Sequence, residues 1–301
     1  MNISTHVLLL TGYATTVATC APHLLSKSRL SERSPGLALV LWHTTVGSAG
    51  FAISLAAVKL VSAVRFLPVN RSGVHGHVLS VVDTLVMVLT GLFVAYYLSA
   101  RLTYAAIALL RAQRTLRRRH LDLVSVLGRH DPELDAFVIP AAAAAAYCVA
   151  GTKKVVITDH AVELLEPRQL DAVLAHERAH LAGRHHLPVG WATLLVEAFP
   201  RVAVLKRLRE ATSNLVELLA DDRARRMVDG SSLATAIGLL AHAAPRGSLA
   251  ATGGQALARV ERLLDPPPRR RTSALIAIAA LTPLLIGVPL ALASYPADVL
   301  F

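Results

Sequence analysis

The hydrophobic positions of the chain gather into four long apolar segments, at residues 6–25, 36–64, 78–100 and 273–295. Each is long enough to cross the hydrocarbon core of a bilayer, which is about 30 Å thick and needs roughly 20 helical residues. The first segment lacks a basic start, and Lys27 and Arg29 follow its apolar part, so it does not have the pattern of a cleaved signal peptide. We therefore predict about four transmembrane helices.

Composition and charge agree with a membrane protein, because 54% of the residues are hydrophobic and the mean hydropathy is +0.51. Positive charges gather between the first two segments, after the third and before the fourth. The positive-inside rule then places the N-terminus outside the cell and the central region, residues 101–271, in the cytoplasm. The predicted parts are a membrane domain at 1–100, a cytoplasmic domain at 101–271, and a last transmembrane helix with a short external tail at 272–301.

The net charge of +11 could also indicate a nucleic-acid-binding protein. The charge lies beside the predicted spans, however, where arginines meet anionic lipid headgroups, and no zinc-finger or helix-turn-helix pattern accompanies it. We expect the lipid bilayer as a partner and no direct nucleic-acid binding. Cys20 and Cys148 are too few for a disulfide scaffold and are expected to be buried apolar residues.

The cytoplasmic part contains an H-E-x-x-H sequence that begins at His176. Pro167 is a suitable first-turn residue and Gly183 a suitable C-cap, so the motif lies in the last turns of a predicted helix. On a helix, His176 and His180 present two imidazoles to one point, which is how two ligands of a tetrahedral zinc ion are held. Glu177 is rotated about 100° round the helix, where it can take a proton from a water that zinc has made more acidic.

Two histidines leave zinc short of a protein ligand, and Glu217 is the best candidate for the third. Glu217 and Asp221 are four residues apart and share a face of a second predicted helix, which Ser213 or Asn214 would cap. One carboxylate can ligate the metal while the other fixes the outward nitrogen of a histidine ligand. The alternative is that both acids, with Asp222, pair with nearby arginines on a wet helix surface.

These two motifs carry a resemblance to a known family. H-E-R-A-H, followed 37 residues later by E-L-L-A-D, resembles the gluzincin pattern of integral-membrane zinc peptidases of the BlaR/MecR type. The HtpX-type and CAAX-prenyl-protease-type enzymes are relatives of that family. The similarity covers about half of the chain and extends into flanking residues at 146–151, 155–158, 170–176 and 258–264.

The resemblance implies a fold class and a set of roles. It implies an α-helical membrane protein that carries an α+β gluzincin-type zinc protease domain. One zinc ion per chain would be held by His176, His180 and Glu217. Glu177 would be the general base, and Asp221 would hold a zinc-bound histidine.

Short β-prone stretches at residues 147–149 and 154–158 flank Ala150-Gly151-Thr152 and predict a hairpin. In gluzincins an edge strand of this kind aligns an extended substrate by main-chain hydrogen bonds. Val155, Val156 and Ile157 are therefore candidate substrate-binding residues. The alternative is that they form a core strand that touches no ligand.

Three further segments have weaker signals. The apolar stretch at 187–199 is either a core helix or a re-entrant segment, because it is short for a span. His185 and His186 follow the predicted end of the motif helix and are expected to be flanking residues at a surface or interface. Gly253 and Gly254 predict a flexible loop near the mouth of the site.

The function implied by the resemblance is a membrane-embedded zinc metalloendopeptidase that cleaves cytoplasmic or membrane-associated proteins. One hypothesis is a regulatory, signalling protease that acts on a cytoplasmic transcriptional repressor, and a second is quality control of the HtpX type. About six residues follow the last predicted span, so we expect no external penicillin-binding domain. A non-enzymatic alternative is a signalling scaffold with structural zinc. The intact Glu177 argues against it, because a structural site needs no base.

Overall fold

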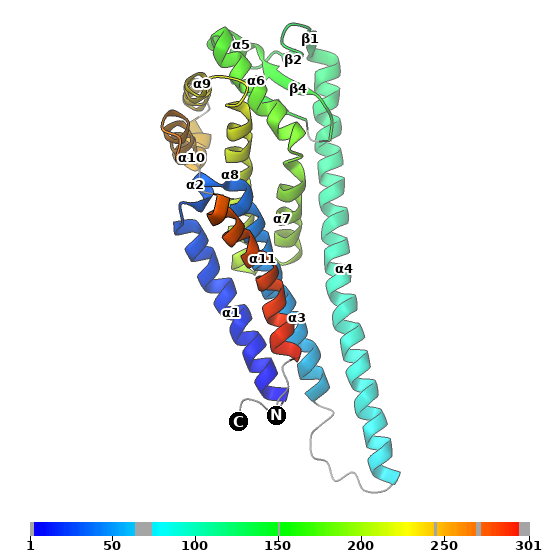
Figure 1. Cartoon of the computed structure of the whole chain (residues 1–301). Coiled ribbons are helices and arrows are strands. Elements are labelled where there is room, and N and C mark those ends of the chain that lie inside the picture. Colours follow the sequence, from blue (N-terminus) through cyan, green and yellow to red (C-terminus); the bar gives the residue numbers. More distant parts are fainter. Residues whose placement is uncertain (1–2, 64–73, 150, 244–245, 269–271, 295–301) are drawn as a thin grey trace.

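The computed structural model describes residues 3–63, 74–149, 151–243, 246–268 and 272–294, and most of them are helical. The helices are α1 (Ile3–Lys27), α2 (Leu30–Arg33), α3 (Pro35–Ala63), α4 (Val74–Leu127), α5 (Asp159–Leu164), α6 (Pro167–Ala182), α7 (His186–Ala198), α8 (Ala203–Ala224), α9 (Gly230–Ala243), α10 (Arg246–Leu264) and α11 (Thr272–Ser294). The strands are β1 (Arg129–Asp131), β2 (Ala136–Ile139), β3 (Ala146–Cys148) and β4 (Val155–Thr158). Figure 1 shows an elongated molecule in which α1, α3 and α11 form one end, the sheet with α5 and α6 forms the other, and α4 runs along both.

Within the described residues, three helices are long and apolar enough to cross a membrane, namely Thr5–Lys27, Pro35–Leu60 and Val88–Leu127. They overlap the first three predicted segments. The third predicted segment lies within α4, which continues unbroken to Leu127. The predicted span at 78–100 and the basic segment after it are therefore one helix, and the domain boundary proposed at residue 100 falls inside it.

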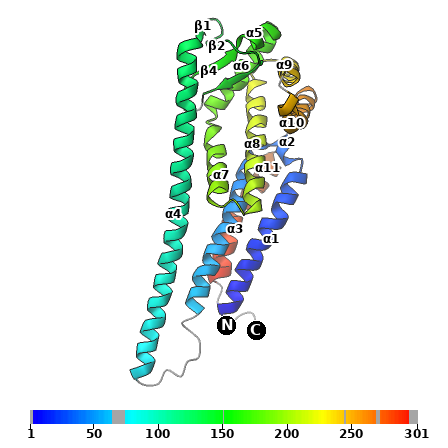
Figure 2. The same ribbon diagram turned by 180° about the vertical axis from the view of Figure 1, so that it is seen from behind.

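The fourth predicted segment corresponds to α11, whose described apolar part, Ala280–Ser294, is shorter than a span. A proline in α11 leaves one backbone carbonyl of that helix without its usual donor, and side chains of α1 and α3 donate to it. Pro289 has no N–H to donate to the carbonyl of Leu285 four residues earlier. The hydroxyls of Tyr13 on α1 and Ser48 on α3 donate to that carbonyl instead, which fits three helices packed side by side in an apolar environment (Figure 2). A total of four spans stays a prediction.

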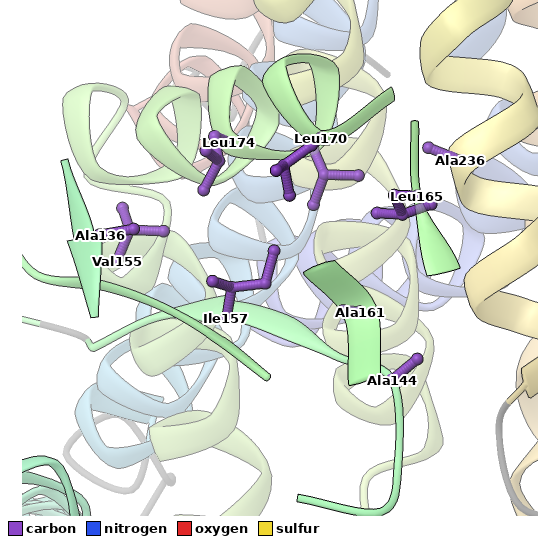
Figure 3. Close-up of a cluster of buried hydrophobic side chains, with 10 residues drawn as sticks. Ala136, Ala144, Val155, Ile157, Ala161, Leu165, Leu170, Leu174 and Ala236 are labelled. Atoms are coloured by element: carbon purple, nitrogen blue, oxygen red, sulfur yellow. The ribbon is translucent and has the colours of Figure 1, made fainter. Parts of the chain in front are cut away.

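The core of the other end lies between α6 and the sheet. The strand order is β1-β2-β4-β3, with β4 parallel to β2 and antiparallel to β3. Leu170 and Leu174 of α6 pack on Ile157 of β4, and all three are at most 7% exposed (Figure 3). α6 begins as predicted, with Pro167 in its first turn, and ends at Gly183. This packing fixes the position of the H-E-x-x-H motif relative to the strands.

The predicted hairpin is confirmed, and of the two alternatives for Val155, Val156 and Ile157 the structure shows the core strand. β4 is bonded to β2 on one side and to β3 on the other, and Val155, Val156 and Ile157 are at most 2% exposed. Their main-chain groups are already used by the two neighbouring strands, so they cannot pair with a substrate. On this side of the described sheet the edge strand is β3. We therefore assign to β3 the pairing with a substrate that the sequence suggested for β4.

Other local predictions also differ from the structure. The helix that carries Glu217 begins at Ala203, so Ser213 and Asn214 lie inside α8 and cap nothing. Gly253 and Gly254 lie inside α10 rather than in a loop. The stretch at 187–199 is helical, as α7. The cysteines are not buried: Cys20 is exposed on α1, and Cys148 is half-buried at the end of β3.

Candidate metal centre

Three side chains from two helices converge on one point. His176 Nε2 and His180 Nε2 on α6 lie 3.1 Å apart, and each lies 3.4 Å from a carboxylate oxygen of Glu217 on α8. Ligand atoms of a tetrahedral zinc ion, about 2.0–2.1 Å from the metal, are separated by roughly 3.3 Å. The contacts of the two imidazoles, one to each oxygen of Glu217, have separations of this size, and the donor set of two imidazoles and one carboxylate is one that zinc accepts.

His176 is oriented by Asp221, one turn beyond Glu217 on α8. Its Nδ1 lies 2.9 Å from Asp221 Oδ1, although the approach is too oblique for a well-aligned hydrogen bond. Burial alone would lower the pKa of His176, but Asp221 and Glu217 raise it to about 9. Burial would likewise raise the pKa of Asp221, but Arg259 and His176 lower it to about 2. The pocket therefore favours a positive charge at the place where a metal would bind.

His180 is oriented by His185, whose Nδ1 lies 3.1 Å from His180 Nδ1. Burial lowers the pKa of His180 to about 4, so its ring is neutral and can act as a ligand. His185 was expected at a surface or an interface, and of the two it does not lie at the surface, because it is only 9% exposed and packs edge-on against His180. His186, in contrast, is exposed.

Gly183 leaves the space that the His185 ring occupies, since an added Cβ would overlap that ring. We expect Gly183→Ala to displace His185 and to weaken zinc binding by roughly 10- to 100-fold, the usual effect of losing a partner of a metal ligand. Competition with a chelator of known affinity measures this loss. Gly190→Ala is the matched control, because its Cβ would make only an ordinary contact with Gln113. Unchanged affinity in Gly183→Ala would show that His185 does not orient His180.

Glu177 lies beside the ligands without joining them. Burial raises its pKa to about 7, and the charge of Glu217 adds to the effect. The backbone N–H and the thiol of Cys148 both donate hydrogen bonds to its carboxylate and lower the pKa in part. Burial, followed by the charge of Glu177, raises the pKa of the Cys148 thiol to about 11, so Cys148 stays protonated. A carboxylate with a pKa near neutrality can both take and return a proton.

Arg259 on α10 joins the two carboxylates of α8. Its Nε and Nη2 donate to Asp221 at 2.8 and 2.7 Å, and its Nη1 lies 2.9 Å from Glu217 Oε2. Its Nη2 also lies 3.4 Å from His176 Nε2. Burial acts to lower the pKa of Arg259, but the two carboxylates raise it. α10 therefore contributes the cation that pairs with the two carboxylates of α8, beside the imidazoles of α6.

The free edge of β3 runs past this group. Val149 N–H donates to the Lys154 carbonyl and Thr158 N–H to the Ala145 carbonyl, so the hydrogen bonds between β3 and β4 alternate along the strand. The main-chain groups of Ala146 and Cys148 consequently point away from β4. A cavity of about 990 Å³, lined by Ala146, His176, Glu177, Glu217 and Arg259, opens at the same place.

The structure brings together His176, Glu177, His180, Glu217 and Asp221, all of which the sequence singled out. Sequence reasoning missed His185, Arg259 and the contact of Cys148 with Glu177. Arg259 had a signal, because it lies in the segment 258–264 where the family resemblance continues past the motifs. Cys148 lies in the segment 146–151, which carries the same signal, whereas His185 had none, since it lies beyond the end of the motif helix.

Comparison with known proteins supports a peptidase. Residues 110–243 match the family model described as Peptidase family M48, which is somewhat less than half of the chain. The match includes the motif helix and Glu217 but not Arg259. It supports metalloprotease chemistry and the M48 family for that part of the chain. No curated protein and no solved structure matches the chain.

Proposed function

We propose that the chain is a membrane-anchored zinc metalloendopeptidase of the M48 type. The observation that carries the proposal is the group formed by His176, His180 and Glu217, whose nitrogen and carboxylate atoms lie 3.1–3.4 Å apart, as ligand atoms do around zinc. Glu177 lies beside that group under an open cavity. The match of residues 110–243 to the family model supports the same chemistry independently of the geometry.

In the proposed mechanism, His176, His180 and Glu217 hold the metal, and Asp221 and His185 orient the two imidazoles. Zinc supplies Lewis acidity, which makes a water more acidic and polarises a carbonyl. Glu177 takes the proton of the attacking water and passes it to the leaving amine, for which a pKa near 7 is suited. The main-chain groups of Ala146 and the carbonyl of Cys148 on β3 align the substrate, because they point away from β4 and can pair with an extended peptide.

The site would act in the cytoplasm. The proposed topology keeps the N-terminus outside and residues 101–271 inside, with α1, α3, α11 and the part of α4 before residue 101 in the bilayer. We keep two classes of substrate. The first is a cytoplasmic repressor, as for BlaR/MecR-type enzymes, and the second is damaged membrane protein, as for HtpX-type enzymes. Capture of cellular substrates by an inactive Glu177→Gln variant separates them, since one regulator or many membrane fragments would accumulate.

Removal of zinc tests the proposal directly. We expect the detergent-purified chain to carry one zinc per chain, to cleave an unfolded model protein, to lose that activity with a chelator and to regain it with zinc. Zinc content by elemental analysis and cleavage by gel measure both properties. Zinc without cleavage would favour the scaffold alternative. A chain that binds no zinc would contradict the proposal at its first step.

A further inference from the structure

A second cavity, of about 710 Å³, lies beside the proposed active site and has a strongly basic wall. Five arginines and two acids line it, together with His185. The arginines come from the α2–α3 connection, the end of α8 and α10, and they are Arg33, Arg223, Arg225, Arg226 and Arg262. The acids, Glu32 and Asp222, leave three positive charges without a matching acid in the wall.

Arg262 is paired with one of the two acids, but part of its guanidinium group is left without a partner among the described residues. It is 9% exposed, its Nε donates to the Glu32 carbonyl at 2.9 Å, and its Nη2 lies 2.8 Å from Asp222. Its Nη1 is buried and has no hydrogen-bond partner in the part of the chain that the structure describes. Arg33 Nε is buried and unpartnered there as well. Buried donors without a partner are costly, so the positive charge of Arg33 and Arg262 is incompletely offset, which favours an anion against this wall.

The position of the cavity indicates which anion is available. Arg33 and Pro35 lie at the start of the candidate span Pro35–Leu60, and the candidate span Thr5–Lys27 ends shortly before them. Figures 1 and 2 both place α2 where the bundle of α1, α3 and α11 meets α8 and α10. The ends of spans lie at the depth of lipid phosphates in a bilayer. Arginine binds phosphate with two parallel hydrogen bonds, which suits this wall.

We propose that this cavity binds the phosphate of an anionic phospholipid headgroup. The fold assembles it from segments more than 200 residues apart, because Arg33 and Arg262 meet only when α10 packs near α2. One lipid would occupy the site, with its phosphate on the arginines of the wall and its acyl chains along the spans. The site does not depend on peptidase activity. Its wall includes His185, so a bound lipid would lie next to the group that orients His180.

The test counts lipids on the full chain in a neutral detergent by native mass spectrometry. Phosphatidylglycerol is titrated against phosphatidylcholine. We expect one phosphatidylglycerol to bind before any other lipid and to bind roughly tenfold or more weakly to Arg223→Gln/Arg226→Gln. Both of these arginines are exposed, so the variant should fold. Arg201→Gln/Arg207→Gln removes the same charge from exposed positions outside the cavity and should bind like wild type.

Arg262→Gln should lose the first phosphatidylglycerol most completely, and a thermal unfolding curve establishes whether that variant is folded. Equal binding of the two lipids, or equal loss in both double variants, would overturn the proposal. Inorganic phosphate separates the two sources of the anion. If it stabilises the chain against heat as strongly as phosphatidylglycerol does, and prevents lipid binding, the ligand is a soluble phosphate and the lipid assignment is wrong.

Discussion

Glu177→Gln should abolish peptide hydrolysis and leave zinc bound. The loss expected for a general base is roughly 10²- to 10⁴-fold in kcat. Glutamine has the size of glutamate and can still accept the N–H of Cys148, but it cannot take a proton from water. The fold should tolerate the change, because burial already raises the pKa of Glu177 to about 7 and a neutral side chain costs little there. Cleavage of an unfolded model protein and zinc content measure the two properties.

Two comparisons make this result specific. Glu163→Gln changes an exposed glutamate on α5 and should leave both cleavage and zinc content unchanged. His176→Ala should lose the metal and the activity together, because it removes one of three ligands. If Glu177→Gln cleaved at the wild-type rate, another group would be the base. If it lost zinc, Glu177 would be supporting the ligands rather than acting on water.

The sequence predicted the structure correctly where the pattern within a single helix determines which residues lie together. The motif helix is bounded by Pro167 and Gly183, and the i and i+4 spacing brings His176 and His180 together regardless of the rest of the fold. Glu217 and Asp221 follow the same logic on α8. The apolar segments are also local signals, which is why three of them reappear as long apolar helices.

The sequence failed where the answer depends on which element packs beside which. Val155, Val156 and Ile157 form a typical strand, but the pairing of β4 with β2 across about 20 residues of chain decides that it is interior. Edge and interior strands differ in their neighbours rather than in their own pattern. His185 lies beyond the helix that carries the motif, and only the turn after Gly183 returns its ring to His180.

Arg259 on α10 contacts Asp221 and Glu217 on α8 and lies near His176 on α6. Arg259→Gln should destabilise the metal-free protein by about 3 kcal/mol, the lower end of the cost of removing one partner from a buried ion pair. Asp221 has a side chain that is 1% exposed and would keep its charge without its closest cation. Glu217 would lose its contact at 2.9 Å. Arg168→Gln, at an exposed position on α6, is the matched control and should cost little.

Zinc should offset much of this loss, which distinguishes a role in charge balance from a role in packing alone. A metal ion bound by Glu217 and His176 supplies positive charge at the place that the guanidinium leaves, so zinc should raise the melting temperature of Arg259→Gln more than that of wild type. Thermal unfolding with and without zinc measures the difference. In Asp221→Asn/Arg259→Gln the two losses should not add, because each single change already breaks the same pair. Equal stabilisation by zinc in both proteins would mean that Arg259 acts by filling space, and additive losses would mean that the Asp221 pair contributes nothing.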